Sequence, residues 1–135
     1  MALAAELLGD RWTLLILREA FYGVIRYDDM LADLGAPRSM LTDRLSRLVE
    51  RGLMERSPYQ EPGSRARQAY TLTTSGRALG ITLIALSAWG EEHILGEPGP
   101  VEFIDNETLN PVSVALTDAG GHPISLSNVK MRLKK

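Results

Sequence analysis

The sequence contains no cysteine and only two histidines, and these shortages remove several classes of function. Without cysteine there is no disulfide, no thiolate nucleophile and no cysteine-ligated zinc. His93 ends an apolar segment and His122 lies in a glycine-flanked turn, so they form neither a catalytic triad nor a metal-ligand set. Ser39 and Thr42 lie near Asp43 without a histidine in the same segment. We therefore expect no enzymatic activity and no cofactor.

Long hydrophobic runs are also missing. No apolar stretch approaches the ~20 residues that span a membrane, and the first residues do not resemble a signal peptide. We expect a cytoplasmic protein with no membrane partner. Hydrophobic residues still make up 44% of the 135 residues, which is enough to form a core.

Positive charge is scarce overall but concentrated in one segment. The formal net charge is −2, yet between residues 38 and 77 eight arginines accompany four carboxylates, a local charge of +4. A basic segment inside an acidic chain predicts one surface that meets phosphate groups while the others are repelled by them.

Residues 38–51 lie at the centre of this basic segment and have the pattern of an amphipathic helix, preceded by Pro37 and closed by Gly52. Its apolar face carries Leu41, Leu45, Leu48 and Val49. Its outward face carries Ser39, Asp43, Ser46, Arg47 and Glu50, with Arg38 and Thr42 on the flank. Short side chains flanked by arginines suit a helix that enters a DNA groove. The alternative is an ordinary solvated helix face.

The preceding residues complete a helix-turn-helix order. Residues 11–21, capped by Asp10, are apolar on most sides and predict the central helix of the core. Residues 24–27 predict a short strand, and residues 28–34 a second helix that Gly35 ends. The helix at residues 38–51 then follows almost at once.

A hairpin is predicted next. Residues 53–59 and 68–73 alternate like strands, and the loop at residues 60–66 contains Pro62-Gly63 turn chemistry. Arg65 and Arg67 at its tip would contact phosphate or the minor groove. The alternative is a solvated loop with two stray charges. The order of elements is that of a winged helix-turn-helix.

The last predicted helix, residues 74–95 with Thr73 as its N-cap, is apolar on almost every side between residues 79 and 89. One small domain cannot cover such a helix, so we expect a homodimer in which it and residues 2–8 pack against their copies. The candidate interface residues are Leu3, Leu7, Leu79, Leu83, Leu86 and Trp89. The alternatives are that the C-terminal tail covers this helix, or that a small-molecule effector binds beside it.

The chain changes character after a linker at residues 96–100. Residues 112–117 and 124–126 flank a turn at residues 118–123 and predict a β-hairpin, with a further strand at residues 129–133. The expected fold is mainly α with small β: a winged helix-turn-helix (α-α-β-α-α-β-β-α) over residues 1–95, plus a C-terminal β-hairpin extension over residues 96–135.

Six segments, taken in order, resemble the HxlR-type winged helix-turn-helix transcriptional regulators, a group related in fold to the MarR regulators. They are Gly9–Arg18, Met40–Leu45, Leu48–Leu53, Tyr59–Glu61, Tyr70–Thr73 and Ala88–Gly90. The resemblance covers residues 2 to about 95. It implies a dimer that is held by N- and C-terminal helices and binds operator DNA.

The resemblance also places the family's recognition helix on residues 37–51 and its wing on residues 60–67. It implies base contacts from Arg38, Ser39, Thr42 and Asp43, and phosphate contacts from Arg47, Arg65 and Arg67. Some members sense oxidants with a cysteine near the N-terminus, and some carry paired cysteines in a ribbon-type tail. The 135 residues contain no cysteine, so we expect neither feature, unless a longer native N-terminus carries the sensing cysteine.

The function predicted from the sequence is therefore a sequence-specific DNA-binding transcriptional regulator that acts as a homodimer on an inverted-repeat operator. One alternative is a ligand-responsive regulator with an effector pocket near the dimer helices. Another is a winged domain used for protein contacts, which the local charge of +4 disfavours.

Overall fold

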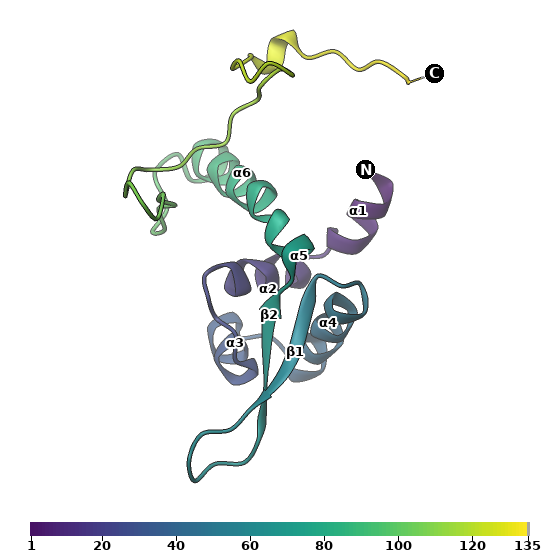
Figure 1. Ribbon diagram of the computed structural model, residues 1–135, viewed down its shortest axis with the longest axis vertical. Coiled ribbons are helices and arrows are strands. Elements are labelled where there is room, and N and C mark those ends of the chain that lie inside the picture. The colour runs from purple at the N-terminus through teal and green to yellow at the C-terminus, as the bar shows by residue number, and fades with distance from the viewer. Residues whose placement is uncertain (135) are drawn as a thin grey trace. The chain divides into compact units, whose positions relative to one another are not determined.

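The computed structural model describes residues 1–134, which divide into two compact units: residues 1–83, and the residues from Ile84 onward. Figure 1 follows the chain through its elements. They are α1 (Ala2–Leu8), α2 (Arg11–Phe21), α3 (Tyr27–Leu34), α4 (Arg38–Glu50), β1 (Met54–Tyr59), β2 (Arg67–Leu72), α5 (Thr74–Ala78), α6 (Gly80–Gly90), a π-helical segment (Glu91–Leu95) and a 3-10 turn (Leu126–Asn128). No helix among the described residues is long and apolar enough to span a membrane.

The core of the first unit lies where α2, α3, α4 and the hairpin meet. Its fully buried side chains are Ile16, Leu17, Met30, Leu41, Leu45, Leu48 and Met54. The three leucines of α4 recur on one helix face and are at most 1% exposed. Burying each one stabilises the fold by roughly 1.5–3 kcal/mol, which fixes the face of α4 that points inward. The predicted central helix, α2, packs against α1, α3, α4 and β2.

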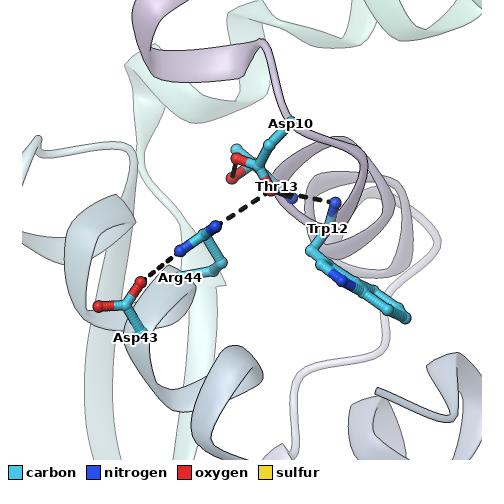
Figure 2. Close-up of polar contacts among 5 residues, drawn as sticks. All are labelled: Asp10, Trp12, Thr13, Asp43 and Arg44. Carbon is cyan, nitrogen blue, oxygen red and sulfur yellow. Dashed lines mark hydrogen bonds and ion pairs between the residues drawn. The ribbon is translucent and has the colours of Figure 1, made fainter. Parts of the chain in front are cut away.

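The start of α2 is tied to α4 through Asp10 (Figure 2). Asp10 caps α2, and its Oδ1 accepts hydrogen bonds from the backbone N–H groups of Trp12 and Thr13, both at 3.1 Å. The Nε of Arg44 in α4 donates to the same oxygen at 3.1 Å. Arg44 also pairs with Asp43, so its guanidinium lies between two carboxylates. One cap therefore joins two helices far apart in the sequence.

The hydrogen bonds around Asp10 shift its ionisation. Burial would raise the pKa of Asp10, but hydrogen bonds from Thr13 and Arg44 outweigh it and hold that pKa below the ordinary value of 3.8. In return, the hydrogen bond to Asp10 raises the pKa of Arg44. The Asp10–Arg44 ion pair therefore stabilises the fold at every pH at which the carboxylate of Asp10 is charged.

The hairpin pairs β1 and β2 antiparallel, from Met54 opposite Leu72 to Tyr59 opposite Arg67. Figure 1 shows the loop that joins them extending away from α2, α3 and α4. The inner ends of both strands are buried, whereas the loop at residues 60–66 is exposed. The predicted wing is thus present, anchored at its base by the core.

The strand predicted at residues 24–27 is wrong. Only Arg26 forms a bridge, with Ala69, and Tyr70 donates its N–H to the carbonyl oxygen of Ile25 at 2.7 Å. Tyr27 already begins α3. The two carboxylates in the first turn of α3 favour a helix there, and too few residues are left before it to make a strand.

The single helix predicted at residues 74–95 is divided into α5, α6 and the π-helical segment. The predicted Thr73 cap is present, and its hydroxyl accepts a hydrogen bond from the N–H of Gly76 at 3.1 Å. Gly76 is buried within the first unit, where an added Cβ would overlap the carbonyl oxygen of Leu53. The close approach of these two backbones therefore requires glycine at this position.

The second unit does not contain the predicted β-hairpin or the additional strand. Between residues 96 and 134 only two isolated bridges form, Ile104 with Pro111 and Thr117 with Pro123. Asp118 organises the predicted turn by accepting from the N–H groups of Gly120 at 2.8 Å and His122 at 3.0 Å. Each bridge contains a proline, which has no N–H with which to extend a ladder. The rest of the fold class, mainly α with a small sheet, is confirmed.

We expect Gly76→Ala to lower the free energy of unfolding by more than about 1 kcal/mol, because the backbone of Leu53 must move. The matched control is Gly90→Ala at the end of α6, where nothing lies within 4 Å of the added carbon. That change should be neutral or stabilise by up to about 1 kcal/mol. Urea unfolding followed by circular dichroism measures both, and equal effects would contradict the assigned contact.

We expect Asp10→Ala to lower the free energy of unfolding at pH 7 by about 1–2 kcal/mol, because α2 loses its cap. Asp10→Asn should lose less, since asparagine still caps but cannot pair ionically with Arg44. The folded-state pKa is depressed, so the contribution is present above pH 3.8 and is lost as the pH falls through the folded value. Asp33→Ala on α3 is the exposed control. A wild-type advantage that stays constant from pH 6 to below 3.8 would refute this assignment.

Candidate nucleic-acid interface

Helices α3 and α4 form the helix-turn-helix. Gly35 ends α3 with φ 58°, a left-handed conformation that glycine adopts readily. Ala36 is buried, and Pro37 leads extended into Arg38, the first residue of α4. The turn is therefore short, and the buried leucines of α4 direct its opposite face outward.

The sequence-predicted contact residues of α4 lie at the surface. Arg38, Ser39, Thr42, Asp43 and Arg47 are exposed, and Ser46 is half-buried. Asp43 is engaged by Arg44, so its carboxylate is partly neutralised.

Tyr27 supports the start of α4 and was missed by the sequence reasoning. Its hydroxyl donates to the carbonyl oxygen of Arg38 at 3.1 Å and lies 2.9 Å from Oγ1 of Thr42. The guanidinium of Arg38 lies over its ring, 5.8 Å from the centroid. The tyrosine hydroxyl has a single proton, which it donates to the carbonyl oxygen of Arg38. The hydroxyl of Thr42 therefore donates to Tyr27, and the lone pairs of Thr42 stay free to accept. The sequence pattern predicts a strand through Tyr27 and therefore gives no sign of its contact with α4.

A hollow of about 340 Å³ separates the helix-turn-helix from the hairpin. It is lined by Tyr27, Asp28, Arg38, Thr42, Tyr59, Arg65, Ala66, Arg67, Gln68 and Tyr70. Two of the predicted residues on α4 therefore share one concave surface with both predicted arginines of the wing. Ser39, Asp43, Ser46 and Arg47 do not line it.

Ion pairs hold the hairpin in place. Arg67 pairs with Asp28 of α3. Arg26 pairs with Glu61 at 2.6 Å, and its guanidinium lies 4.8 Å from the centre of the Tyr59 ring. Sequence reasoning missed Arg26, whose partners lie at the end of β1 and in the loop after it. These contacts hold the hairpin at the end where its strands meet the loop, while the loop at residues 60–66 stays exposed.

The arginines of this surface differ in how far they are neutralised. Arg26, Arg44 and Arg67 are paired with carboxylates. Within residues 1–134, no ion pair forms at Arg38, Arg47 or Arg65. The charge of these three guanidinium groups is therefore not neutralised by a carboxylate and is available to an anionic partner.

The candidate dimer residues fall into two groups. Leu3, Leu86 and Trp89 are 82%, 47% and 53% exposed. Leu7, Leu79 and Leu83 are half-buried, and Leu79 and Leu83 pack against the core of the first unit. The exposed group includes large apolar side chains on α1 and α6, which are free to meet another surface.

No catalytic or metal-binding constellation forms among the described residues. No group of three or more histidine, aspartate and glutamate side chains that could hold a metal lies within residues 1–134. His122 lies 3.3 Å from Asp118 within an exposed turn, and His93 lies beside its neighbour Glu92 and the Trp89 ring.

Comparison with known proteins identifies the domain. The family model for the HxlR-like helix-turn-helix matches residues 7–97. A protein named as an uncharacterized HTH-type transcriptional regulator of Mycobacterium tuberculosis is 47% identical over 97 residues, 72% of this chain. That match spans only 60% of the mycobacterial protein.

Solved structures show the same fold. PA1607, described as a candidate transcription factor, superimposes with a TM-score of 0.82 at 30% identity, over 97% of this chain and 92% of its own. A regulator described as MarR-family, from Enterococcus faecalis V583, has a TM-score of 0.57 at 31% identity, over 70% of this chain and 86% of its own.

The match to PA1607 thus extends over nearly the whole chain, whereas the match to the Enterococcus protein covers a smaller part. The fold is a winged helix-turn-helix of the MarR-like group, and the curated relatives are named as transcriptional regulators rather than enzymes. The resemblance that the six sequence segments carry is confirmed, and the chain belongs to the HxlR-like helix-turn-helix family.

Proposed function

We propose that this protein is a transcriptional regulator that binds an inverted-repeat operator as a homodimer. Each subunit places α4 in a major groove and the tip of the β1–β2 hairpin on the flanking backbone. The observation that carries this proposal is the surface on which Arg38, Thr42, Arg65 and Arg67 line one hollow beside the exposed face of α4. Residues 1–95 act as the DNA-binding and dimerisation domain, and residues 96–135 as an extension.

The charges on this surface suggest separate roles. Arg47 and Arg65 have no ion pair within residues 1–134 and suit phosphate contacts, which give affinity without reading sequence. Ser39 and Thr42 are short and exposed, so they can approach base edges. Because its own proton is directed to Tyr27, Thr42 is poised to accept from the amino group of adenine or cytosine in the major groove. Asp43 and Ser46 lie beside these positions.

The dimer places two copies of α4 on one face of the duplex. Half-sites would then lie about one turn of duplex apart, roughly 34 Å. The support for the dimer is that large apolar side chains are exposed in each unit, Leu3 on α1 and Leu86 and Trp89 on α6. Two-fold symmetry uses the same surface on both subunits.

A second candidate is a ligand-responsive regulator. The observation in its favour is a hollow of about 290 Å³ along α6, lined partly by Ile84, Ala88, Val101 and Phe103. An effector bound there would change the affinity of the protein for its operator. This function would therefore add to DNA binding and not replace it. A compound that both stabilises the protein and changes its operator affinity would establish it.

We expect Arg65→Ala to weaken binding to every duplex by a similar factor. Removing one phosphate contact should also reduce the slope of log affinity against log salt concentration by about 0.9. Thr42→Val should instead change which operator sequence is preferred, with about 1–3 kcal/mol of discrimination lost at one base pair. Fluorescence anisotropy over a salt series, with operator and scrambled duplexes, measures both.

The matched control is Arg77→Ala on α5. Arg77 is exposed and does not line the hollow, so its loss should leave the salt slope nearly unchanged. A flat salt response of the wild type would refute the phosphate surface. Loss of sequence preference in Arg65→Ala would show that the two roles are assigned wrongly.

We expect Leu86→Glu to weaken self-association at least about tenfold, because a charge would be buried where two apolar surfaces meet. Sedimentation equilibrium measures the dimer dissociation constant, and circular dichroism checks that the variant is folded. Ile25→Glu is a control at an exposed apolar residue outside the candidate interface. A wild-type chain that stays monomeric, or a Leu86→Glu variant that remains fully dimeric, would argue against this interface.

A further inference from the structure

The second unit carries an uneven distribution of charge. Residues 91–107 contain six carboxylates and no lysine or arginine. Residues 129–135 contain four basic side chains and no carboxylate. Within residues 1–134, none of the six carboxylates pairs with a lysine or an arginine. The acidic and basic segments of this unit therefore form no ion pairs with each other within residues 1–134.

The acidic segment borders the hollow along α6. Glu91 and Glu102 both line it, together with the apolar side chains of Ile84, Val101 and Phe103. Glu91 lies against Gly99, where an added Cβ would be 2.7 Å from its Oε1, and Ser87 donates to the same oxygen at 3.5 Å. No basic residue lines this hollow of about 290 Å³. Its occupant should therefore be apolar on one side and cationic on the other.

The terminal segment of this chain has that character. From residue 129 onward, apolar side chains alternate with basic ones: Val129, Met131 and Leu133 with Lys130, Arg132 and Lys134. In extended backbone, alternate side chains point to opposite sides, so the segment has an apolar edge and a cationic edge. Met131 and Leu133 are 92% and 85% exposed, so the chain itself leaves them uncovered. Six extended residues reach about 20 Å.

We propose that the terminal segment of one subunit binds in the acidic hollow along α6 of its dimer partner, and that the partner returns the same contact. This inference rests on the proposed homodimer and names a second interaction within it. A two-fold dimer supplies both halves of the contact twice, so the exchange closes on itself. Charge complementarity selects the pairing, and the apolar side chains of the segment fill the hollow.

Charge reversal tests the exchange in the full chain. The first variant combines Glu91→Lys with Glu102→Lys, and the second combines Lys130→Glu with Arg132→Glu. Each alone should weaken self-association about tenfold. An equimolar mixture should recover wild-type affinity, because each reversed tail then meets a reversed hollow on the other chain. Sedimentation with one fluorescently labelled partner follows the mixed dimer.

The matched control combines Glu97→Lys with Glu107→Lys, which changes the net charge equally at two carboxylates outside the hollow. It should leave self-association near the wild-type value. Zero-length carboxyl–amine crosslinking of a mixture of ¹⁵N-labelled and unlabelled wild type gives a second readout. Crosslinks from Glu91 or Glu102 to Lys130 or Lys134 should join labelled to unlabelled chains.

The outcomes separate this inference from the dimer itself. A wild-type dimer that neither reversal weakens, or that weakens without rescue in the mixture, overturns the exchange and leaves the dimer standing. Crosslinks confined within single chains also overturn it, because the segment would then cover its own hollow. A wild type that is monomeric at every concentration refutes the proposed homodimer directly.

Discussion

The burial of one leucine stripe determines what this protein can present to a partner. Leu41, Leu45 and Leu48 occupy the centre of the core together with residues of α2 and with Met54. Rotating α4 would expose these side chains at a cost of several kcal/mol, so its opposite face has to point outward. The Asp10–Arg44 contact adds a polar tie between the start of α2 and the middle of α4. Apolar burial selects the face, and this hydrogen-bonded pair helps to fix the register.

The same packing decides which positive charges remain available. The arginine-rich segment between residues 38 and 77 is not uniformly basic in the folded chain. Arg44 is placed between two carboxylates and Arg67 is paired with Asp28, so both are partly neutralised. Arg38, by contrast, lies over the Tyr27 ring, which leaves its charge intact. A phosphate that approached Arg67 would have to compete with Asp28, whereas one at Arg65 would meet no such competitor within residues 1–134.

The second unit follows a different physical pattern. Its turns are organised by aspartates that accept backbone N–H groups, and the hydrogen bonds from Thr108 and its neighbours lower the pKa of Asp105. The hydrogen bond from the His122 backbone likewise lowers the pKa of the exposed Asp118, although slight desolvation opposes it. Local turns of this kind need no buried core. Many apolar side chains there consequently remain exposed, including Leu109 and Leu126 at 67% and 75%.

The amino-acid sequence by itself determined the helix-turn-helix, the hairpin, both N-caps and the inward face of α4. These features are set by local capping and by apolar periodicity, which act within a few residues. It did not determine the bridge at Arg26, the support of Tyr27 for α4, or the pairing of Arg67 with Asp28. The sequence pattern also predicted more strand pairing in the extension than the structure contains, because proline removes the N–H donors that a β-ladder requires. Only the tertiary structure decided which arginines stay unpaired, because that depends on carboxylates distant in the chain that folding brings beside them.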